Sequence, residues 1–282
     1  MDILIIIPAY NEAQFIAECL DSLLNQSILP KKIIVVDDGS TDETPQILKK
    51  YASENQIISV YTKSKSDEHQ PGAKIIEAFQ FGLNQVDFSY DVLCKYDADL
   101  VFPENYLEIM NEAYTKNPNL GMFGGICSIQ KGNEWVIENL TNQDHIRGAL
   151  KSYRKACFDD IGGLVTAMGW DTIDEFQARF RNWEVQTTSE LVVKHRKPTG
   201  HSYAKSLPKR FGISLFQMRY SFILASITCI KMAFNKKSFA FANKSILSFL
   251  TANSKKNPFL ISDQEGKFIR NYRWKNIKSK LF

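Results

Sequence analysis

Short apolar runs alternate with amphipathic stretches along the first 130 residues. The apolar runs are five to seven residues long and predict buried strands, whereas the stretches between them space their apolar residues three or four apart and predict helices. This alternation is typical of an α/β fold in which helices cover both faces of a mainly parallel sheet. The predicted strands are 3–7, 32–36, 57–61, 90–96 and 120–125, and the predicted helices are 12–26, 43–53, 72–85 and 103–116.

The C-terminal part of the chain has a different pattern. Residues 213–234 and 237–252 each combine a wide apolar face with a stripe of polar and basic side chains, which predicts amphipathic helices. Residues 206–282 contain eleven Lys and four Arg but only two acids, a net charge of +13, whereas the whole chain carries +4. Residues 1–205 are therefore acidic, at −9. We predict one α/β domain over 1–205 and a basic helical extension over 206–282.

The basic extension predicts a partner that is either anionic or apolar. Its helices could lie on an anionic membrane surface, or pack against the α/β domain or a second copy of the chain as a homo-oligomer, and the sequence leaves these alternatives open. Nucleic acid is not predicted as a partner because no known binding motif is present.

Neither a membrane span nor a secretion signal is predicted. Only eleven uncharged residues separate Arg219 from Lys231, whereas a span needs about 20 apolar residues. The N-terminal apolar run follows an acid and has no cationic segment before it, so it does not resemble a signal peptide. The five cysteines include no C-x-x-C pair, which favours a reducing compartment. We expect a cytoplasmic protein, with peripheral attachment to the inner membrane face as one option.

Polar, turn-prone clusters follow three of the predicted strands. Because parallel strands end at the same edge of a sheet, these clusters are expected to meet there. A helix start explains the acids Asp42 and Glu43. It does not explain the adjacent pair Asp37 and Asp38, whose charges repel unless a cation or a polar ligand lies between them. The three clusters are PAYNE (8–12), DDGSTD (37–42) and DAD (97–99).

The last of these clusters predicts a metal site. Asp97 and Asp99 stand two residues apart in a segment that leaves a strand, so both side chains can point to the same place. Oxygen ligands of this kind, together with phosphate oxygens, are preferred by Mg²⁺ and Mn²⁺. We predict a divalent metal cofactor at this position.

The segments IIIPAYNE, VVDDGSTD and KYDADL, in this order and spacing, resemble those of family 2 glycosyltransferases, which are inverting enzymes with the GT-A fold. The resemblance covers roughly residues 3–200 and implies that 1–205 is the catalytic domain. It implies that Asp97 lies at the ribose and that Asp99 binds the metal. It further implies nucleotide contacts from Pro8, Ala9, Tyr10, Glu12, Asp37, Asp38, Gly72 and Lys74, although HQPGAK departs from the Arg-Gly or Asn-Gly pattern that the family usually has there.

The same resemblance implies a general base in the segment GWDTIDEFQARFRNW. It puts Asp171 at the position of the base, with Asp174 and Glu175 as alternatives on the same helical face. Trp170 and Asn182 depart from the family, which usually has Glu and Gly at these places. A second interpretation makes Asp171 a helix cap, and capping and catalysis are compatible.

Two further segments resemble parts of the family's site. In VVKHRKPTGH, His195 resembles a histidine that joins the metal or diphosphate site, and Arg196 would contact phosphate. In DHIRGALKSYRKACF, the resemblance implies that Gly148, Tyr153 and Arg154 line the donor-sugar and acceptor pocket. The alternative for this second segment is a loop that leads into a helix with solvated basic residues.

The resemblance implies a metal-dependent enzyme that moves one sugar from a nucleotide sugar, a UDP-sugar first of all, to a hydroxyl of a surface glycan or a lipid-linked saccharide. A single displacement would invert the anomeric centre. One alternative is a sugar-1-phosphate nucleotidyltransferase, which would need a Gly-rich loop where this chain has PAYNE. The other is an inactive glycan-binding or scaffold protein of the same fold.

Overall fold

The computed structural model describes residues 1–63, 73–138, 145–197 and 206–281. Its sheet has nine strands, in the order β3-β2-β1-β4-β8-β6-β9-β5, with β7 paired to β6. The strands are β1 (Ile3–Ala9), β2 (Lys32–Asp37), β3 (Ile58–Thr62), β4 (Val92–Tyr96), β5 (Leu100–Val101), β6 (Leu120–Lys131), β7 (Glu134–Ile137), β8 (Leu150–Arg154) and β9 (Glu184–His195).

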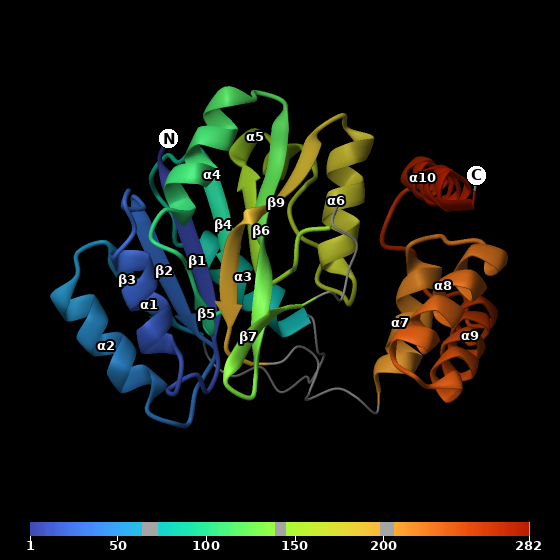
Figure 1. Ribbon diagram of the computed structural model, residues 1–282, viewed down its shortest axis with the longest axis horizontal. Helices are drawn as coiled ribbons and strands as arrows, with labels where there is room; N and C mark the ends of the chain where they lie inside the picture. The colour runs from blue at the N-terminus through green and yellow to red at the C-terminus, as the bar shows by residue number, and fades with distance from the viewer. Residues whose placement is uncertain (64–72, 139–144, 198–205, 282) are drawn as a thin grey trace.

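Helices cover both faces of this sheet, and three more form a bundle at one end of the molecule (Figure 1). The helices of the sheet layer are α1 (Ile16–Leu24), α2 (Thr44–Glu54), α3 (Ala73–Leu83), α4 (Tyr106–Lys116), α5 (Lys155–Asp160) and α6 (Trp170–Phe180). The bundle consists of α7 (Leu207–Gln217), α8 (Phe222–Asn235) and α9 (Phe239–Ser254), and α10 (Asp263–Leu281) follows it. The α/β architecture predicted from the alternation of apolar runs is confirmed.

The first four strands of the chain are parallel neighbours. Their register pairs Ile5 of β1 with Ile33 of β2 and with Cys94 of β4, and these side chains are buried completely. The strands are therefore almost wholly apolar, as expected for a sheet covered on both faces. Their carboxyl ends meet at one edge, where the loops that follow β1, β2 and β4 lie side by side.

An antiparallel strand, β8, interrupts the parallel order. It lies between β4 and β6, and its register pairs Lys151 with Lys95. The sequence of β8, LKSYR, looks like a solvated segment, yet Lys151 and Ser152 are buried completely. The prediction missed this strand because the partners of its polar groups lie elsewhere in the chain: Ser152 Oγ lies 2.9 Å from the Tyr114 hydroxyl, and Lys151 pairs with acids of α6.

A single amphipathic helix over 213–234 was the wrong prediction. The chain leaves the helix after Gln217 and begins α8 at Phe222. Arg219 takes a left-handed conformation (φ 56°), and its Nη1 lies 2.7 Å from Asp263 Oδ1. The hydroxyl of Ser221 accepts a hydrogen bond from the Leu224 N–H at 3.4 Å, which caps the new helix. The apolar periodicity continues across the break, so the sequence pattern gave no sign of it.

The C-terminal helices build a second apolar core with α6. Ile173 and Phe176 of α6 join a buried cluster that contains Leu215, Leu224 and Ile269. The α6 helix thus contacts the sheet layer on one side and the extension on the other. Within the part of the chain that the structure describes, no helix combines the length and the apolar character that a bilayer span requires.

Candidate active site

The loops after β1 and β2 are hydrogen-bonded to each other at the carboxyl edge of the sheet. Asn11 Oδ1 accepts a hydrogen bond from the Thr41 N–H at 2.8 Å. Of the predicted nucleotide contacts in this region, Pro8 and Ala9 are buried as the last residues of β1, whereas the Tyr10 side chain is 46% exposed. Tyr10 is therefore the member of this group whose ring is available to a ligand.

The two adjacent acids after β2 have different surroundings. Asp37 is buried, and its Oδ1 accepts a hydrogen bond from the Ser40 N–H at 2.9 Å. This carboxylate therefore stabilises the turn that follows β2. Asp38 Oδ1 lies 3.3 Å from Lys63 Nζ, and both side chains are largely buried. The cation that the pair requires is thus Lys63, which stands at the end of β3 and was not singled out by the sequence pattern.

Glu12 lies close enough to Asp97 and Asp99, the predicted metal-site acids, to interact with their charges. Its carboxylate forms an ion pair with Lys197. Burial raises the pKa of Glu12, and the negative charges of Asp99 and Asp97 raise it further. The hydrogen bond and charge of Lys197 lower it, and the resulting pKa is about 7. Glu12 therefore changes its charge near neutral pH.

This shift predicts a pH-dependent stability. In the folded chain Glu12 keeps its proton up to about pH 7, whereas in the unfolded chain it releases the proton near the ordinary glutamate pKa of 4.5. The stabilisation is complete below pH 4.5 and is lost as the pH rises through 7. The free energy of unfolding of Glu12→Gln, measured by urea denaturation, should therefore gain on that of the wild type between pH 4.5 and 7. Parallel pH profiles of the two proteins would contradict the shift.

Three potential metal ligands converge beside Glu12. One ligand atom each from Asp97, Asp99 and His195 lies within 4.8 Å of the others. The antiparallel pairing of β5 with β9 brings this about, since Leu100 is the register partner of His195. Two carboxylates and an imidazole fit a divalent ion such as Mn²⁺ in both chemistry and spacing. The sequence predicted all three residues for this region, and the structure brings them together.

His195 is held by acids on two sides. Its Nε2 lies 3.3 Å from Asp99 Oδ2, and its Nδ1 lies 4.0 Å from Glu138 Oε2. Burial alone would lower the pKa of His195, but the neighbouring acids Asp99 and Glu138 outweigh burial and raise it to about 9. The pKa of Asp99 is lowered correspondingly, since the hydrogen bond and charge of His195 outweigh its burial. Glu138 also forms an ion pair with Arg147.

Two buried lysines connect the metal-site acids to α6. Lys95 forms an ion pair with Asp97, and its Nζ donates a hydrogen bond to the Gly148 carbonyl at 3.0 Å. Lys151 is its register partner on β8, and its Nζ donates to the backbone carbonyl of Asp171. The Nζ atoms of Lys95 and Lys151 lie 5.3 Å and 5.7 Å from the centre of the Trp170 ring.

Asp171, the predicted base, lies in the first turn of α6. Its side chain is 35% exposed, and its Oδ2 lies 3.9 Å from Nε2 of His145. A Cβ atom at Gly148 would lie 3.1 Å from the Cβ of Asp171, a tight contact, so a larger residue here would push this segment away from the helix by a few tenths of an ångström. Gly148 connects the metal-site acids with the predicted base. Its carbonyl accepts a hydrogen bond from Lys95, which pairs with Asp97, and its Cα lies next to Asp171. Nδ1 of His145 lies 3.0 Å from Glu175 Oε1.

Asp174, the alternative base, lies in a different environment from Asp171. Its side chain is 1% exposed, both of its oxygens accept hydrogen bonds from Lys151, and Oδ2 also accepts one from the Tyr153 hydroxyl at 2.6 Å. Burial raises its pKa, while Lys151 opposes this. In this structure the carboxylate of Asp174 is therefore enclosed and bonded, whereas that of Asp171 is partly exposed. Tyr153, a predicted donor contact, is fully buried beside it.

Arg154 lies apart from the other predicted site residues. It ends β8 opposite Val92, the first residue of β4, whereas the metal-site acids follow the last residue of β4. Its guanidinium donates hydrogen bonds to the carbonyls of Tyr114, Asn117 and Leu120. Because β8 is antiparallel to β4, the end of β8 lies at the amino edge of the sheet, away from the predicted donor pocket.

The remaining predicted contacts lie at the periphery of the site. Arg196 follows β9, and its Nε lies 2.8 Å from Glu18 Oε2 of α1. Lys74 is the second residue of α3 and is half-buried. Gly72 lies outside the described residues.

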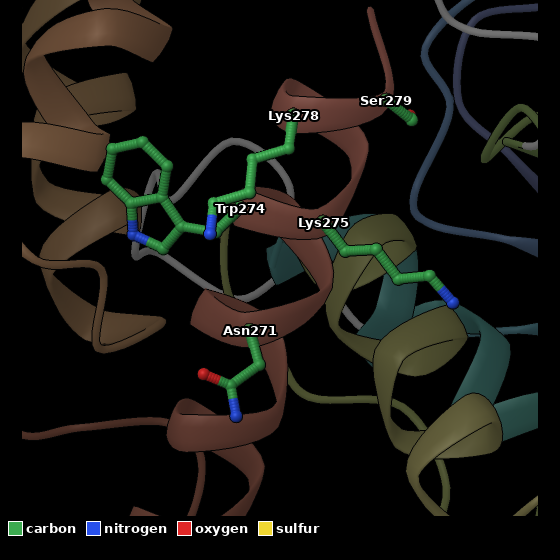
Figure 2. Close-up of a pocket in the computed structure, with 5 residues that line it drawn as sticks. All are labelled: Asn271, Trp274, Lys275, Lys278 and Ser279. Carbon is green, nitrogen blue, oxygen red and sulfur yellow. The ribbon is translucent and has the colours of Figure 1, made fainter. Parts of the chain in front are cut away.

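A separate concavity lies along α10, with a volume of about 640 Å³. In Figure 2, Trp274 and Lys275 point to opposite sides of the helix. Among the described residues, the lining offers neither a carboxylate nor a histidine and includes none of the predicted site residues. Its lining residues are Asn271, Trp274, Lys275, Lys278 and Ser279.

Of the site residues that the sequence analysis did not predict, one could have been found from the sequence pattern. A lysine inside an apolar strand, as in VLCKY, must either break the burial pattern or find a buried partner, and Lys95 finds one in Asp97. Lys63, His145 and Glu138 had no such sign, because their partners are distant in sequence.

The comparison with protein families decides the relationship. The model of glycosyl transferase family 2 matches residues 4–164, more than half of the chain and the part that contains β1, β2, β4 and the Asp97–Asp99 pair. The chain belongs to glycosyl transferase family 2.

Relatives and solved structures agree with this family 2 assignment. Chondroitin synthase from Escherichia coli is 28% identical over 180 residues, which are 63% of this chain and 24% of the relative. The chain thus spans about a quarter of the length of that relative. A crystal structure of S. aureus TarS 1–349 in complex with UDP-GlcNAc has a TM-score of 0.57 at 20% identity and covers 72% of this chain and 61% of its own.

A mannosyltransferase, PcManGT from Pyrobaculum calidifontis, was solved in complex with GDP-Man and Mn²⁺. It has a TM-score of 0.59 at 14% identity and covers 99% of this chain and 80% of its own. These likenesses show that the fold is GT-A-like, as predicted.

Proposed function

We propose that this family 2 chain is an inverting glycosyltransferase that moves one sugar from a UDP-sugar to a hydroxyl of a surface glycan or a lipid-linked saccharide. One arrangement carries the proposal: Asp97, Asp99 and His195 cluster at the carboxyl edge of the sheet, and the partly exposed Asp171 lies at the other end of the Lys95–Gly148 connection. A group of acidic metal ligands and a partly exposed carboxylate are what transfer from a nucleotide diphosphate requires.

In this proposal Asp99 and His195 hold a divalent ion, and Asp97, which the resemblance puts at the ribose, joins them as a third ligand. When bound, the ion would stabilise the negative charge on the departing diphosphate. Asp171 accepts the proton of the acceptor hydroxyl while the oxygen of that hydroxyl attacks the anomeric carbon from the side opposite the leaving group. The attack and the departure occur in one displacement, so the configuration at the anomeric carbon is inverted. Tyr10 and Asp38 would contact the nucleotide.

The two solved structures differ in the base of the nucleotide sugar that they contain, and the choice of UDP follows TarS. TarS was solved with UDP-GlcNAc, whereas PcManGT was solved with GDP-Man. Membership of family 2 favours sugar transfer over the nucleotidyltransferase alternative. The inactive alternative has no observation in its favour, since the metal cluster and Asp171 are both present.

A thermal-shift series tests the donor and the metal together. With a UDP-sugar at 100 times its Kd and Mn²⁺ present, the wild-type chain should gain about 2.7 kcal/mol of stability. Asp99→Ala should abolish the part of this gain that depends on Mn²⁺, because loss of a direct ligand weakens metal binding by more than the roughly 10–100-fold typical of outer-shell changes.

Glu112→Ala is the matched control, since Glu112 is an exposed acid paired only with the exposed Lys116. It should behave as the wild type does. Stabilisation by GDP-sugars alone would correct the base of the nucleotide, and stabilisation by no nucleotide sugar would contradict the enzyme function.

A further inference from the structure

The outer face of α8 leaves an apolar stripe uncovered. Ile223, Ile227, Ile230 and Phe234 follow one another at intervals of four, three and four residues, which places them on one side of the helix. They are 62%, 39%, 46% and 65% exposed, whereas Cys229 on the opposite side is fully buried against the neighbouring helices. An amphipathic helix normally hides such a stripe, so this one is available to a partner.

The stripe ends at a turn that concentrates aromatic and basic side chains. The ring centres of Phe234 and Phe239 lie 5.8 Å apart, and the two rings meet edge to face across the α8–α9 connection. Phe239 is 75% exposed, the highest value among the exposed large apolar side chains in the described part of the chain. Lys236 and Lys237 stand between the two rings in sequence and are exposed as well. We call Phe234, Lys236, Lys237 and Phe239 the α8–α9 tip.

Exposed apolar side chains gather in this part of the molecule. Of the fifteen large apolar side chains that are exposed in the described residues, nine belong to 222–259. The bundle of α7, α8 and α9 lies at one end of the molecule, beyond α6 and away from the sheet (Figure 1).

Charge identifies the partner. Residues 206–262 contain nine Lys and Arg and not a single acid. A symmetric dimer through this face would bring the lysines of one copy against those of the other, since both copies present the same patch. An apolar stripe surrounded by basic side chains fits instead a surface that is apolar below and anionic above, which describes the headgroup layer of an anionic bilayer.

We propose that the α8 stripe and the α8–α9 tip dock this protein on an anionic lipid bilayer, with Phe234 and Phe239 inserted at the level of the headgroups and Lys236 and Lys237 against lipid phosphates. The proposal rests on the exposure and charge of these helices and does not depend on the sugar-transfer function. Docking would hold the family 2 domain close to acceptors that are carried in the membrane.

Vesicle flotation of the full chain tests the docking. Vesicles of phosphatidylglycerol and phosphatidylcholine at 3:7 should carry the protein, pure phosphatidylcholine vesicles should carry much less, and added salt should release it. Lys236→Gln/Lys237→Gln should lower the partition coefficient about 30-fold, since each lysine near such a surface contributes a factor of about five. Phe234→Ser/Phe239→Ser should lower it at least about tenfold.

Matched control variants show whether a loss of flotation is specific to the α8–α9 tip. Lys49 and Lys50 are an adjacent exposed pair on α2, and Lys49→Gln/Lys50→Gln should float as the wild type does. Leu29 is 58% exposed in the α/β domain, and Leu29→Ser should also float normally. Donor binding by all variants is measured in the absence of vesicles, so a loss of folding or of the transferase site is recognised separately.

Three results would overturn the proposal. One is equal flotation of wild type and both tip variants, and another is the absence of flotation with anionic vesicles. The third is a concentration-dependent dimer in sedimentation velocity that the Phe234→Ser/Phe239→Ser variant dissociates, which would make the stripe a contact between two copies of the chain.

Discussion

Asp171→Asn is expected to lower sugar transfer by about 10²–10⁴-fold, the usual effect of losing a general base. The substitution keeps the size and the polar character of the side chain but removes its ability to take a proton from the acceptor. Nucleotide-sugar binding should be unchanged, because the metal-site acids belong to other elements of the fold. The measurement is the rate of UDP release with water as the acceptor, beside the Mn²⁺-dependent thermal shift.

Asp159→Asn provides the matched control for this prediction. Asp159 is an exposed acid near the end of α5 and pairs only with Lys155, so its change should leave the rate as it is. Wild-type turnover by Asp171→Asn would remove Asp171 from the role of base. Loss of donor binding together with transfer would instead indicate that Asp171 positions the donor.

Lys151→Met is expected to destabilise the fold by about 3–5 kcal/mol, the usual cost of breaking a buried ion pair from one side. Lys151 is completely buried, and its Nζ lies 2.7 Å from Asp174 Oδ1 and 3.1 Å from Glu175 Oε1. Without the lysine, the buried carboxylate of Asp174 would lose the cation that contacts both of its oxygens, whereas Glu175 would keep Arg179 and His145. Urea denaturation of the full chain measures the difference.

Lys155→Met is the control, four residues further along the chain. Lys155 is 44% exposed and pairs with Asp159 one helical turn away, so its loss should change the free energy of unfolding by less than about 1 kcal/mol. A double change of Lys151→Met with Asp174→Asn should recover part of the lost stability, because it removes one of the charges left uncompensated. A loss of under about 1 kcal/mol for Lys151→Met alone would contradict the buried network.

The parallel half of the sheet could be predicted from the sequence in some detail. Runs such as ILIII and KIIVV are buried whatever their neighbours are, because an apolar strand of this length has no other stable place. Asp97 and Asp99 could be placed at the edge for a similar local reason, since they follow the last strand residue directly. The family resemblance then linked these segments to one chemistry, and the match to glycosyl transferase family 2 agrees.

The residues on and around the antiparallel strand β8 could not be placed from the sequence in the same way. Tyr153, Arg154 and Asp174 were all expected near the donor or acceptor, yet two are fully buried and Arg154 lies at the opposite edge of the sheet. The positions of Tyr153 and Arg154 depend on the direction of β8, and nothing in the five residues of that strand says whether it runs parallel or antiparallel to β4. Asp174 belongs to α6 and is buried against β8 through Lys151.

What the sequence by itself determined is therefore the set of local, periodic features: the apolar strands, the acids at their ends, the basic character of 206–282 and the family. Only the tertiary structure decided which charged groups pair inside the protein, as Lys95 does with Asp97 and Lys151 with Asp174. The same is true of α8, whose apolar stripe is visible in the sequence, while its exposure depends on which sides the neighbouring helices cover. Burial and pairing are properties of contacts between distant segments, and a local pattern does not contain them.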